Sequence, residues 1–203
     1  MMVRLRLSAY GTDQSFLKAE IDRQVKELLA IIPEAVFGFD DENLGIVLGR
    51  MLVESGKTLA LAESCTGGNI AHFITSNAGS SAYFKGGVVA YSNEIKNRLL
   101  DVPMELLKTY GAVSLEVAEA MAIGAQKALN ADYSVATTGI AGPDGGSDEK
   151  PVGTVWIAVA GPSGVTSKKY IFKHNRERNI IRTTHTALNL LRTFILTDNS
   201  ASK

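Results

Sequence analysis

The chain has 203 residues, of which 45% are hydrophobic and 21% are charged, and this is the composition of an ordinary globular protein. Its 21 Lys and Arg residues balance its 21 Asp and Glu residues, so the formal net charge is zero. Nucleic-acid binders usually carry a positive excess that neutralises phosphates, so the charge balance gives no support for that class. The single cysteine, Cys65, excludes an intramolecular disulfide and a cysteine-based zinc cage.

Targeting segments and metal-binding patterns are missing from the sequence. The start, Met1-Met2-Val3-Arg4, has no apolar core of a signal peptide, and no apolar run approaches the roughly 18 residues of a membrane span. We therefore expect a soluble, cytoplasmic protein. His, Asp and Glu do not occur at spacings typical of metal ligands, so we expect no required metal.

Residues 1–43 are predicted to form a small N-terminal β-α-β extension. Residues 3–9 alternate apolar and polar side chains, which is the period of a half-buried strand, and residues 35–39 indicate a second strand. The apolar residues between them have helical spacing as far as Pro33, which ends the helix. The unit is too small for us to expect an independent domain.

Residues 44–203 are predicted to form a three-layer α/β/α domain with a mixed, largely parallel sheet. After Gly56, strands, glycine-bearing loops and helices alternate, which is typical of a sheet with helices on both faces. The predicted strands are residues 58–62, 86–91, 133–137, 154–160 and 168–172, the last two forming a hairpin. Two of the predicted helices begin at a capping residue, one after Asp40-Asp41 and one after Ser114. The other predicted helices cover residues 69–76, 92–99 and 180–195.

Three loops that leave predicted strand ends are rich in hydroxyl groups or glycine, namely residues 62–68, 91–96 and 137–146. Ligands of open α/β sheets bind at the carboxyl ends of the strands. Amides of a glycine loop before a helix could hold a phosphate, or an oxyanion beside Ser64, because the helix dipole adds about half a positive charge there. The spacing by itself favours the simpler interpretation that these glycines only permit a tight turn.

Ser64 is a weak nucleophile until a base takes its proton. The chain has three histidines, His72, His174 and His185, and we expect structural or surface roles for them because none lies in a glycine-rich loop. Lys96 is the alternative base, although a free lysine has a pKa of about 10.4 and is protonated at neutral pH. Lys96 can act as a base only if its helix packs over the cleft, and otherwise it is a solvated helix residue.

Two neighbours of Ser64 allow more than one interpretation. Cys65 could be a thiol nucleophile, but without a well-placed histidine the sequence favours a small residue packed beneath the loop. Glu63 could orient a group of a substrate or cap backbone amides, and both roles remain open.

Several short motifs together suggest a family. They are residues 62–68, 79–84, 86–93, Lys96, residues 111–114, 138–143 and 150–155. In this order, and across residues 44–196, they resemble the CinA carboxy-terminal family, the nicotinamide-nucleotide amidases. The resemblance implies hydrolysis of the carboxamide of nicotinamide mononucleotide to nicotinate mononucleotide and ammonia, without a cofactor.

The resemblance also implies roles for individual residues. Ser64 is the implied nucleophile and Lys96 the implied general base, while Tyr91, Ser81 and Thr138 match polar positions of the catalytic centre. The implied substrate-binding residues are Glu63, Thr66, Gly67, Gly68, Asn93, Gly139, Gly142 and Lys150.

The binding roles divide into two groups. Loop amides near Thr66, Gly67 and Gly68 are expected to stabilise an oxyanion. Amides of residues 139–142, or the side chain of Lys150, are expected to hold the phosphate.

Two regions depart from the family pattern. Family members commonly have Glu directly after the position of Ser114, whereas here Leu115 intervenes and Glu116 follows. Residues 174–178 look lengthened before the last helix, so the match of the arginines is ambiguous. Arg176, Arg178 and Arg182 are therefore not assigned to the site.

Residues 1–43 resemble the end of the KH-like linker domain of longer CinA proteins. They contain no G-x-x-G loop, so RNA binding of the usual KH type is not expected. The partner we expect is a small-molecule nucleotide, with no nucleic acid and no membrane, and related proteins suggest a homodimer.

Two alternative functions remain open. One is a non-catalytic nucleotide-binding or regulatory domain that kept the fold and lost turnover. The other is a DNA-linked factor of competence or the damage response, and the zero net charge argues against direct DNA contact.

Overall fold

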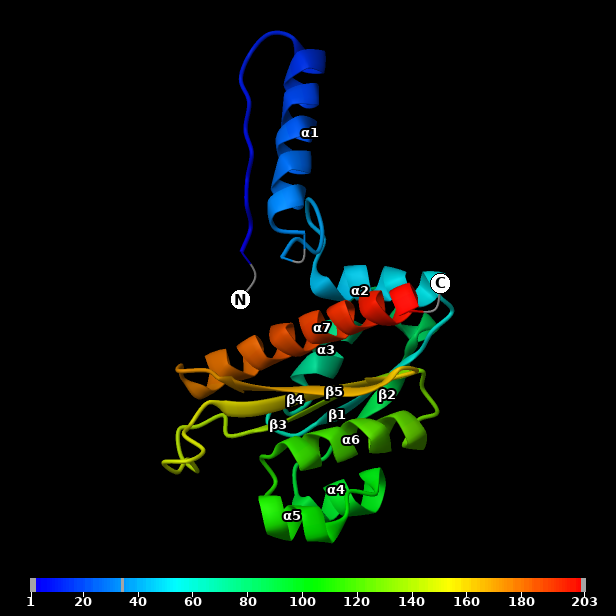
Figure 1. The fold of residues 1–203 in the computed structure, drawn as a ribbon, viewed down its shortest axis with the longest axis vertical. Helices are drawn as coiled ribbons and strands as arrows, with labels where there is room; N and C mark the ends of the chain where they lie inside the picture. Colours follow the sequence, from blue (N-terminus) through cyan, green and yellow to red (C-terminus); the bar gives the residue numbers. More distant parts are fainter. Residues whose placement is uncertain (1–2, 34, 202–203) are drawn as a thin grey trace. The chain divides into compact units, whose positions relative to one another are not determined.

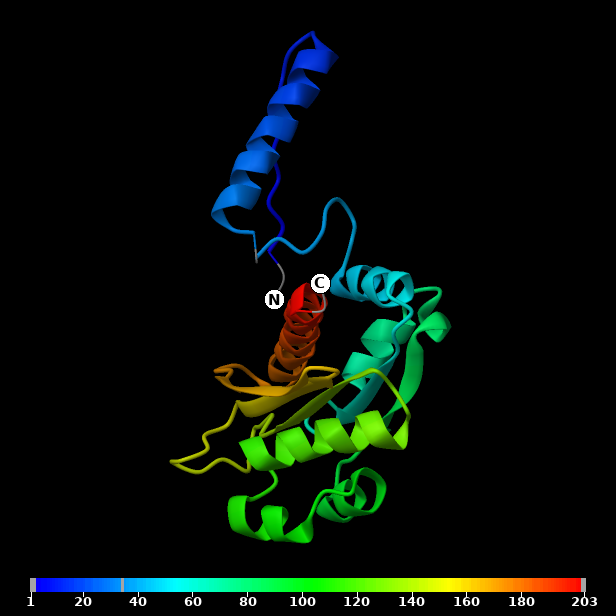
Figure 2. The ribbon, with the colours of Figure 1, turned by 45° about the vertical axis from the view of Figure 1, so that its right-hand side comes forward.

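The computed structural model describes residues 3–33 and 35–201. Figures 1 and 2 show the ribbon from two directions. The chain divides into two compact units, Met1–Glu42 and Asn43–Lys203.

The first unit is built on helix α1 (Gln14–Ile31), which confirms the predicted helix. Asp13 caps it by accepting a hydrogen bond from the Phe16 amide at 3.0 Å. The two predicted strands are wrong, because residues 3–9 and 35–39 have no strand structure, nor does any other described residue of this unit. Alternating side chains favour an extended backbone, but a strand also needs a hydrogen-bonded partner, and these described segments do not pair.

The second unit contains a five-stranded sheet in the order β2-β1-β3-β4-β5. The strands are β1 (Leu59–Glu63), β2 (Phe84–Val89), β3 (Tyr133–Gly139), β4 (Thr154–Gly161) and β5 (Gly164–Ile171). β1 pairs in parallel with β2 and β3, while β3–β4 and β4–β5 are antiparallel, so β4 alone runs against the others. The predicted mixed sheet and its hairpin are confirmed.

Helices cover both faces of this sheet (Figure 1). One face carries α2 (Leu44–Glu54), α3 (Asn69–Thr75) and α7 (Arg176–Ala201), and the other carries α6 (Leu115–Ala128). Outside α6 lie α4 (Asn93–Leu100) and α5 (Met104–Tyr110), and a short 3₁₀ turn, η1 (Ser80–Ala82), precedes β2. The predicted three-layer arrangement is confirmed. None of the described helices combines the length and apolar character that a membrane span requires.

The caps of two helices can be compared with the prediction. Asn43, and not the Asp40-Asp41 pair, caps α2, because its side chain accepts hydrogen bonds from the Gly45 and Ile46 amides at 2.8 and 3.0 Å. Ser114 caps α6 as predicted. Asn and Asp serve equally well as caps, so the sequence pattern alone misplaces this start by a few residues.

Small residues bring α4 close to α6 and α6 close to the sheet. Ala60 and Ala62 of β1 belong to the core on the α6 side. On α6, a Cβ added at Gly124 would lie 1.9 Å from the Leu100 carbonyl oxygen at the end of α4. The two helices are therefore in backbone contact, and this contact positions the helix that carries Lys96.

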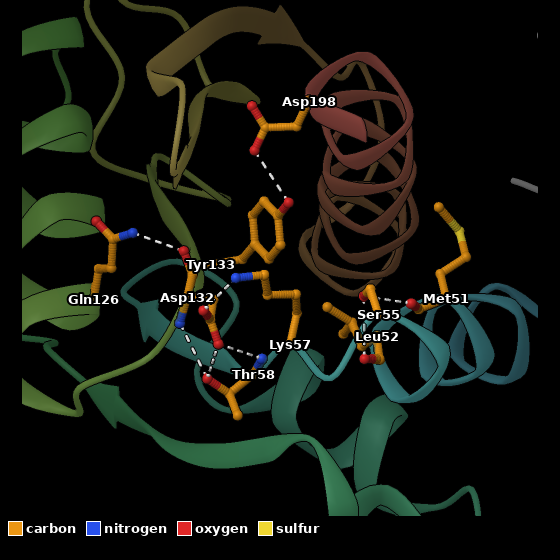
Figure 3. A network of polar contacts seen from close by, with 9 residues as sticks. All are labelled: Met51, Leu52, Ser55, Lys57, Thr58, Gln126, Asp132, Tyr133 and Asp198. Carbon is orange, nitrogen blue, oxygen red and sulfur yellow. Dashed lines mark hydrogen bonds and ion pairs between the residues drawn. The ribbon is translucent and has the colours of Figure 1, made fainter. Parts of the chain in front are cut away.

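A polar network joins the amino ends of β1 and β3 (Figure 3). The Asp132 carboxylate accepts hydrogen bonds from Lys57 Nζ at 3.0 Å, from the Thr58 amide at 2.9 Å and from Thr58 Oγ1 at 2.7 Å. The Tyr133 hydroxyl donates to Asp198 of α7 at 3.0 Å. These contacts hold β1, β3 and α7 together at the amino ends of the two strands.

Replacing Gly124 with Ala is expected to lower the free energy of unfolding by about 1–3 kcal/mol, because the new Cβ forces α4 away from α6. The loss is expected although alanine is the better helix former. Urea denaturation measures the change, and Ile123→Ala on the exposed side of the same helix is the control, with a change within about 0.5 kcal/mol. An unchanged midpoint for Gly124→Ala would contradict the backbone contact.

Candidate active site

The carboxyl ends of three strands meet at one edge of the sheet. Glu63, the last residue of β1, pairs with Val89 of β2 and with Thr137 of β3. The residues that follow these strands, including Ser64 and Tyr91, are therefore brought together, as the strand pattern predicts.

A cavity of about 230 Å³ opens at this edge. Six of the predicted site residues line it, namely Ser64, Tyr91, Asn93, Lys96, Thr138 and Gly139. Pockets for drug-sized molecules usually measure about 300–1,000 Å³, so this cavity is slightly smaller than that range.

Lys96 lies on α4, and its side chain reaches the bottom of this cavity. The residue is 1% exposed. Its Nζ lies 3.2 Å from Ser64 Oγ, 2.8 Å from the Ala90 carbonyl oxygen and 3.4 Å from the Tyr91 carbonyl oxygen. The condition for a lysine base, that its helix packs over the cleft, is met.

The surroundings of Lys96 favour the neutral amine. Burial lowers the pKa of Lys96 from its usual 10.5, and among the described residues no carboxylate forms an ion pair with it. A neutral amine has two hydrogens and one lone pair. If the hydrogens go to the carbonyls of Ala90 and Tyr91, the lone pair is left for the hydroxyl of Ser64. This is the arrangement that a general base requires.

Ser64 sits on a turn that Glu63 stabilises. The Glu63 carboxylate is 2% exposed and accepts hydrogen bonds from the amides of Gly68, Ile70 and Ala71 at 3.0, 3.1 and 2.8 Å. Of the two roles that the sequence left open, the structure places Glu63 as the cap of α3, outside the cavity lining. The predicted contact of Glu63 with a substrate stays a prediction, because the side chain does not line the cavity.

The amides of the Ser64 loop are not all available for an oxyanion. The Gly67 amide donates to the Ser64 carbonyl at 3.2 Å, and the hydroxyl of Thr66 bonds that of Thr137 at 2.7 Å and so holds the loop on β3. In the described part of the chain, the amides of Cys65 and Thr66 donate to no backbone carbonyl, and Cys65 lines the cavity. They are therefore the loop amides that remain candidates.

The other residues considered as nucleophile or base are Cys65 and the three histidines. Burial raises the pKa of the Cys65 thiol to about 12, so the thiol stays protonated at neutral pH. His72, His174 and His185 all lie outside the cavity lining. Across residues 3–33 and 35–201, no group of three or more His, Cys, Asp or Glu side chains could hold a metal ion.

Thr138 lines the cavity, but its hydroxyl already has a partner. Thr138 Oγ1 donates to the Ala112 carbonyl at 2.6 Å, and the residue is 1% exposed. It thus fixes the segment before α6, whose residues Ala112 and Val113 form another wall of the cavity.

Seven predicted site residues do not line the cavity, namely Glu63, Thr66, Gly67, Gly68, Ser81, Gly142 and Lys150, and for Ser81 and Lys150 the structure shows where the side chain lies. Ser81 is exposed in η1, before β2 begins, and the six residues of β2 separate it from the site edge by about 17 Å. Lys150 Nζ donates to the Tyr110 carbonyl at 2.8 Å and does not line the cavity. The described chain does not bring either side chain to Ser64.

Arg176, at the start of α7, lines the cavity but was not assigned from the sequence. Its guanidinium donates to the Gly142 carbonyl at 2.8 Å and to the Tyr91 hydroxyl at 3.1 Å. The only sequence signal is a run of basic residues between positions 173 and 182, which does not distinguish one arginine from the others. The Gly142 carbonyl accepts from Arg176, and the role predicted for its amide stays a prediction.

Comparison with known proteins identifies relatives over most of the chain. The family model of the CinA C-terminal domain matches residues 41–195. A CinA-like protein of Cytophaga hutchinsonii is 50% identical over 190 residues, which are 94% of this chain and 46% of that protein. A CinA-like protein of Flavobacterium psychrophilum is 47% identical over 199 residues, 98% of this chain and 48% of that protein. The chain spans about half the length of these curated relatives.

Solved structures show the same fold. The competence/damage inducible protein CihA from Agrobacterium tumefaciens has a TM-score of 0.73 and 41% identity, over 78% of this chain and 97% of that one. A CinA superfamily protein from Klebsiella pneumoniae has a TM-score of 0.74 and 33% identity, over 77% of this chain and 99% of that one.

Replacing Lys96 with Met is expected to change how stability depends on pH. The folded-state pKa of Lys96 is lowered, so between that pKa and the unfolded value of about 10.4 the unfolded chain binds more protons. The free energy of unfolding of the wild type therefore rises with pH in this window, relative to that of Lys96→Met. Urea titrations across the window measure the difference, with Lys85→Met, which removes an exposed positive charge, as the control. Parallel profiles for wild type and Lys96→Met would contradict a lowered pKa.

Proposed function

The chain belongs to the CinA C-terminal domain family, and on that premise we propose that it is a serine amidase that converts nicotinamide mononucleotide and water to nicotinate mononucleotide and ammonia. The substrate is the one that the resemblance of its motifs implies. The observation that carries the reaction class is the buried amine of Lys96, 3.2 Å from the Ser64 hydroxyl at the bottom of a cavity. A serine beside a lysine whose pKa is lowered by burial is the arrangement of a Ser–Lys hydrolase.

In the first half of the proposed reaction, neutral Lys96 accepts the hydroxyl proton of Ser64 while Ser64 Oγ forms a bond to the carboxamide carbon. The carbonyl oxygen becomes an oxyanion, for which the amides of Cys65 and Thr66 are the candidate donors. One such donor typically contributes about 3–4 kcal/mol. The carbon–nitrogen bond then breaks, Lys96 returns its proton to the leaving nitrogen, and ammonia departs.

In the second half, water attacks the ester carbon of the acyl-enzyme. Lys96 accepts a proton from this water, the bond from the carbon to Ser64 Oγ breaks, and the proton returns to Ser64. The products are nicotinate mononucleotide and a regenerated enzyme, so the balance requires only one water for each amide.

The charge of the substrate agrees with a lysine base. The nicotinamide ring of the mononucleotide is a pyridinium cation, and a nearby positive charge disfavours the protonated form of an amine. Burial already lowers the pKa of Lys96, so substrate binding and the protein act in the same direction. A histidine base would not be needed, which is consistent with histidines that lie outside the cavity.

The test is release of ammonia from nicotinamide mononucleotide in the presence of a chelator. Wild type is expected to turn over, whereas Ser64→Ala and Lys96→Ala are expected to lose at least about 1,000-fold in kcat/KM, because each removes one member of the catalytic pair. Ser76→Ala, at an exposed serine after α3, is the control and is expected to keep full activity. The rate of the wild type is expected to rise with pH as Lys96 loses its proton.

Three other outcomes would decide against parts of the proposal. A folded wild type without turnover would favour the non-catalytic nucleotide-binding domain. Turnover that survives in Lys96→Ala would exclude the lysine as the base. Turnover that survives in Ser64→Ala would keep the amidase and exclude the serine nucleophile.

A further inference from the structure

The turn that follows β1 is attached to its surroundings at two places. Residues 68–71 are held by the Glu63 carboxylate, which accepts hydrogen bonds from three amides of this segment. Residues 64–66 are held by Thr137 of β3. Outside residues 63–71, the hydrogen bonds of residues 64–66 in the described chain go to Thr137 and to the amine of Lys96. One residue of the neighbouring strand therefore holds the part of the turn that carries the nucleophile.

Thr137 contacts this segment through two different groups. Its carbonyl oxygen accepts a hydrogen bond from the Ser64 amide at 3.0 Å. Its hydroxyl bonds the Thr66 hydroxyl at 2.7 Å. In the register of β1 and β3, Glu63 lies opposite Thr137, so Thr137 stands where the turn begins. Both contacts are shielded from water, because Thr137 is 0% and Thr66 3% exposed.

The two contacts lie on either side of Cys65. The amides of Cys65 and Thr66, which donate to no described backbone carbonyl, are the candidate donors for the oxyanion. A peptide unit is planar, so its direction is set once the residues at its two ends are fixed. Thr137 fixes Ser64 through its amide and Thr66 through its hydroxyl. The direction of both candidate donors therefore depends on Thr137.

The Ser64 hydroxyl depends on the same contacts. Ser64 Oγ lies 3.2 Å from Lys96 Nζ, and a small displacement of the turn would lengthen this distance. Without the hydroxyl of Thr137, the buried Thr66 hydroxyl would lose its partner in a place that water does not reach. A buried hydroxyl without a partner is unfavourable, so the turn would move until Thr66 finds another one.

We propose that Thr137 is a positioning residue of the reaction, whose hydroxyl acts through Thr66 to hold the turn where Ser64 attacks and the loop amides meet the oxyanion. The inference rests on the proposed function for the reaction in which it is measured. Thr137 does not line the cavity, so it touches neither the substrate nor the reacting atoms. Since the oxyanion forms only during the reaction, loss of the hydroxyl is expected to lower kcat and to leave KM close to its wild-type value.

The experiment compares kcat and KM for ammonia release from nicotinamide mononucleotide. Thr137→Val removes the hydroxyl and keeps the carbonyl, and it is expected to lower kcat roughly 10- to 100-fold, the usual effect of a reacting group displaced by about 1 Å. Thr137→Ser keeps the hydroxyl and is expected to restore kcat. Thr66→Val removes the same hydrogen bond from the side of the turn and is expected to give the same loss as Thr137→Val. The double variant is expected to lose no more than either single one, because both remove one shared interaction.

Thr154→Val is the matched control. Its hydroxyl lies in β4, is fully buried and has no hydrogen-bond partner among the described residues, so its removal is expected to leave kcat unchanged. An unchanged kcat in Thr137→Val, an equal loss in Thr137→Ser, an effect confined to KM, or the same loss in Thr154→Val would overturn the positioning role. If Thr137→Val does not fold, Thr66→Val decides by the same criteria.

A second measurement is independent of the natural substrate. Phenylmethylsulfonyl fluoride labels an activated serine, because the serine oxygen bonds to sulfur, fluoride leaves and the hydroxyl proton passes to the base. Mass spectrometry follows the labelling of Ser64, which is expected to be roughly 10-fold slower in Thr137→Val and unchanged in Thr154→Val. If wild type releases no ammonia but shows this pattern of labelling, the positioning role stands and the amidase does not. A wild type that shows neither turnover nor labelling would overturn both.

Discussion

The burial of one amine is the constraint on which the site depends. A lysine nitrogen can be buried at low cost only if it is neutral and its hydrogens have acceptors. The carbonyls of Ala90 and Tyr91, just beyond β2, accept the hydrogens of Lys96, and burial lowers the pKa of its amine. Those contacts require α4 to lie over the carboxyl ends of the strands, and α4 is held there by its backbone contact with α6 at Gly124. The position of the base thus depends on a glycine outside the cavity.

Two basic side chains line the cavity at different depths, with Lys96 buried and Arg176 exposed. At the floor, burial disfavours a charge and lowers the pKa of the Lys96 amine, which lies 3.2 Å from Ser64 Oγ. At the mouth, water screens and solvates the permanent charge of Arg176. The reverse arrangement would fail, because a guanidinium at the floor could not lose its proton and would need a buried counter-charge. Depth therefore makes a charge on Lys96 unfavourable and leaves the charge of Arg176 solvated.

Local patterns predicted the elements of the second unit well, because periodicity and turn residues act over a few positions. The five strands, the hairpin and the Ser114 cap follow from them. The strands expected at residues 3–9 and 35–39 do not form, because alternation cannot supply a pairing partner. Among the candidate residues, the family resemblance, and not the spacing, selected Ser64 and Lys96. It left out Arg176, whose neighbours do not distinguish it from other arginines.

The sequence by itself determined the alternation of strands and helices, the loops that carry hydroxyl groups at strand ends, and the family to which those loops belong. Only the tertiary structure decided that Lys96 is buried against Ser64, that Glu63 caps α3, and that Arg176 reaches Tyr91. The reason is physical. A pKa, a cap and a hydrogen-bond partner depend on which groups surround a side chain, and these groups come from distant parts of the chain. Lys96 and Ser64 are 32 residues apart, and Arg176 and Tyr91 are 85 residues apart.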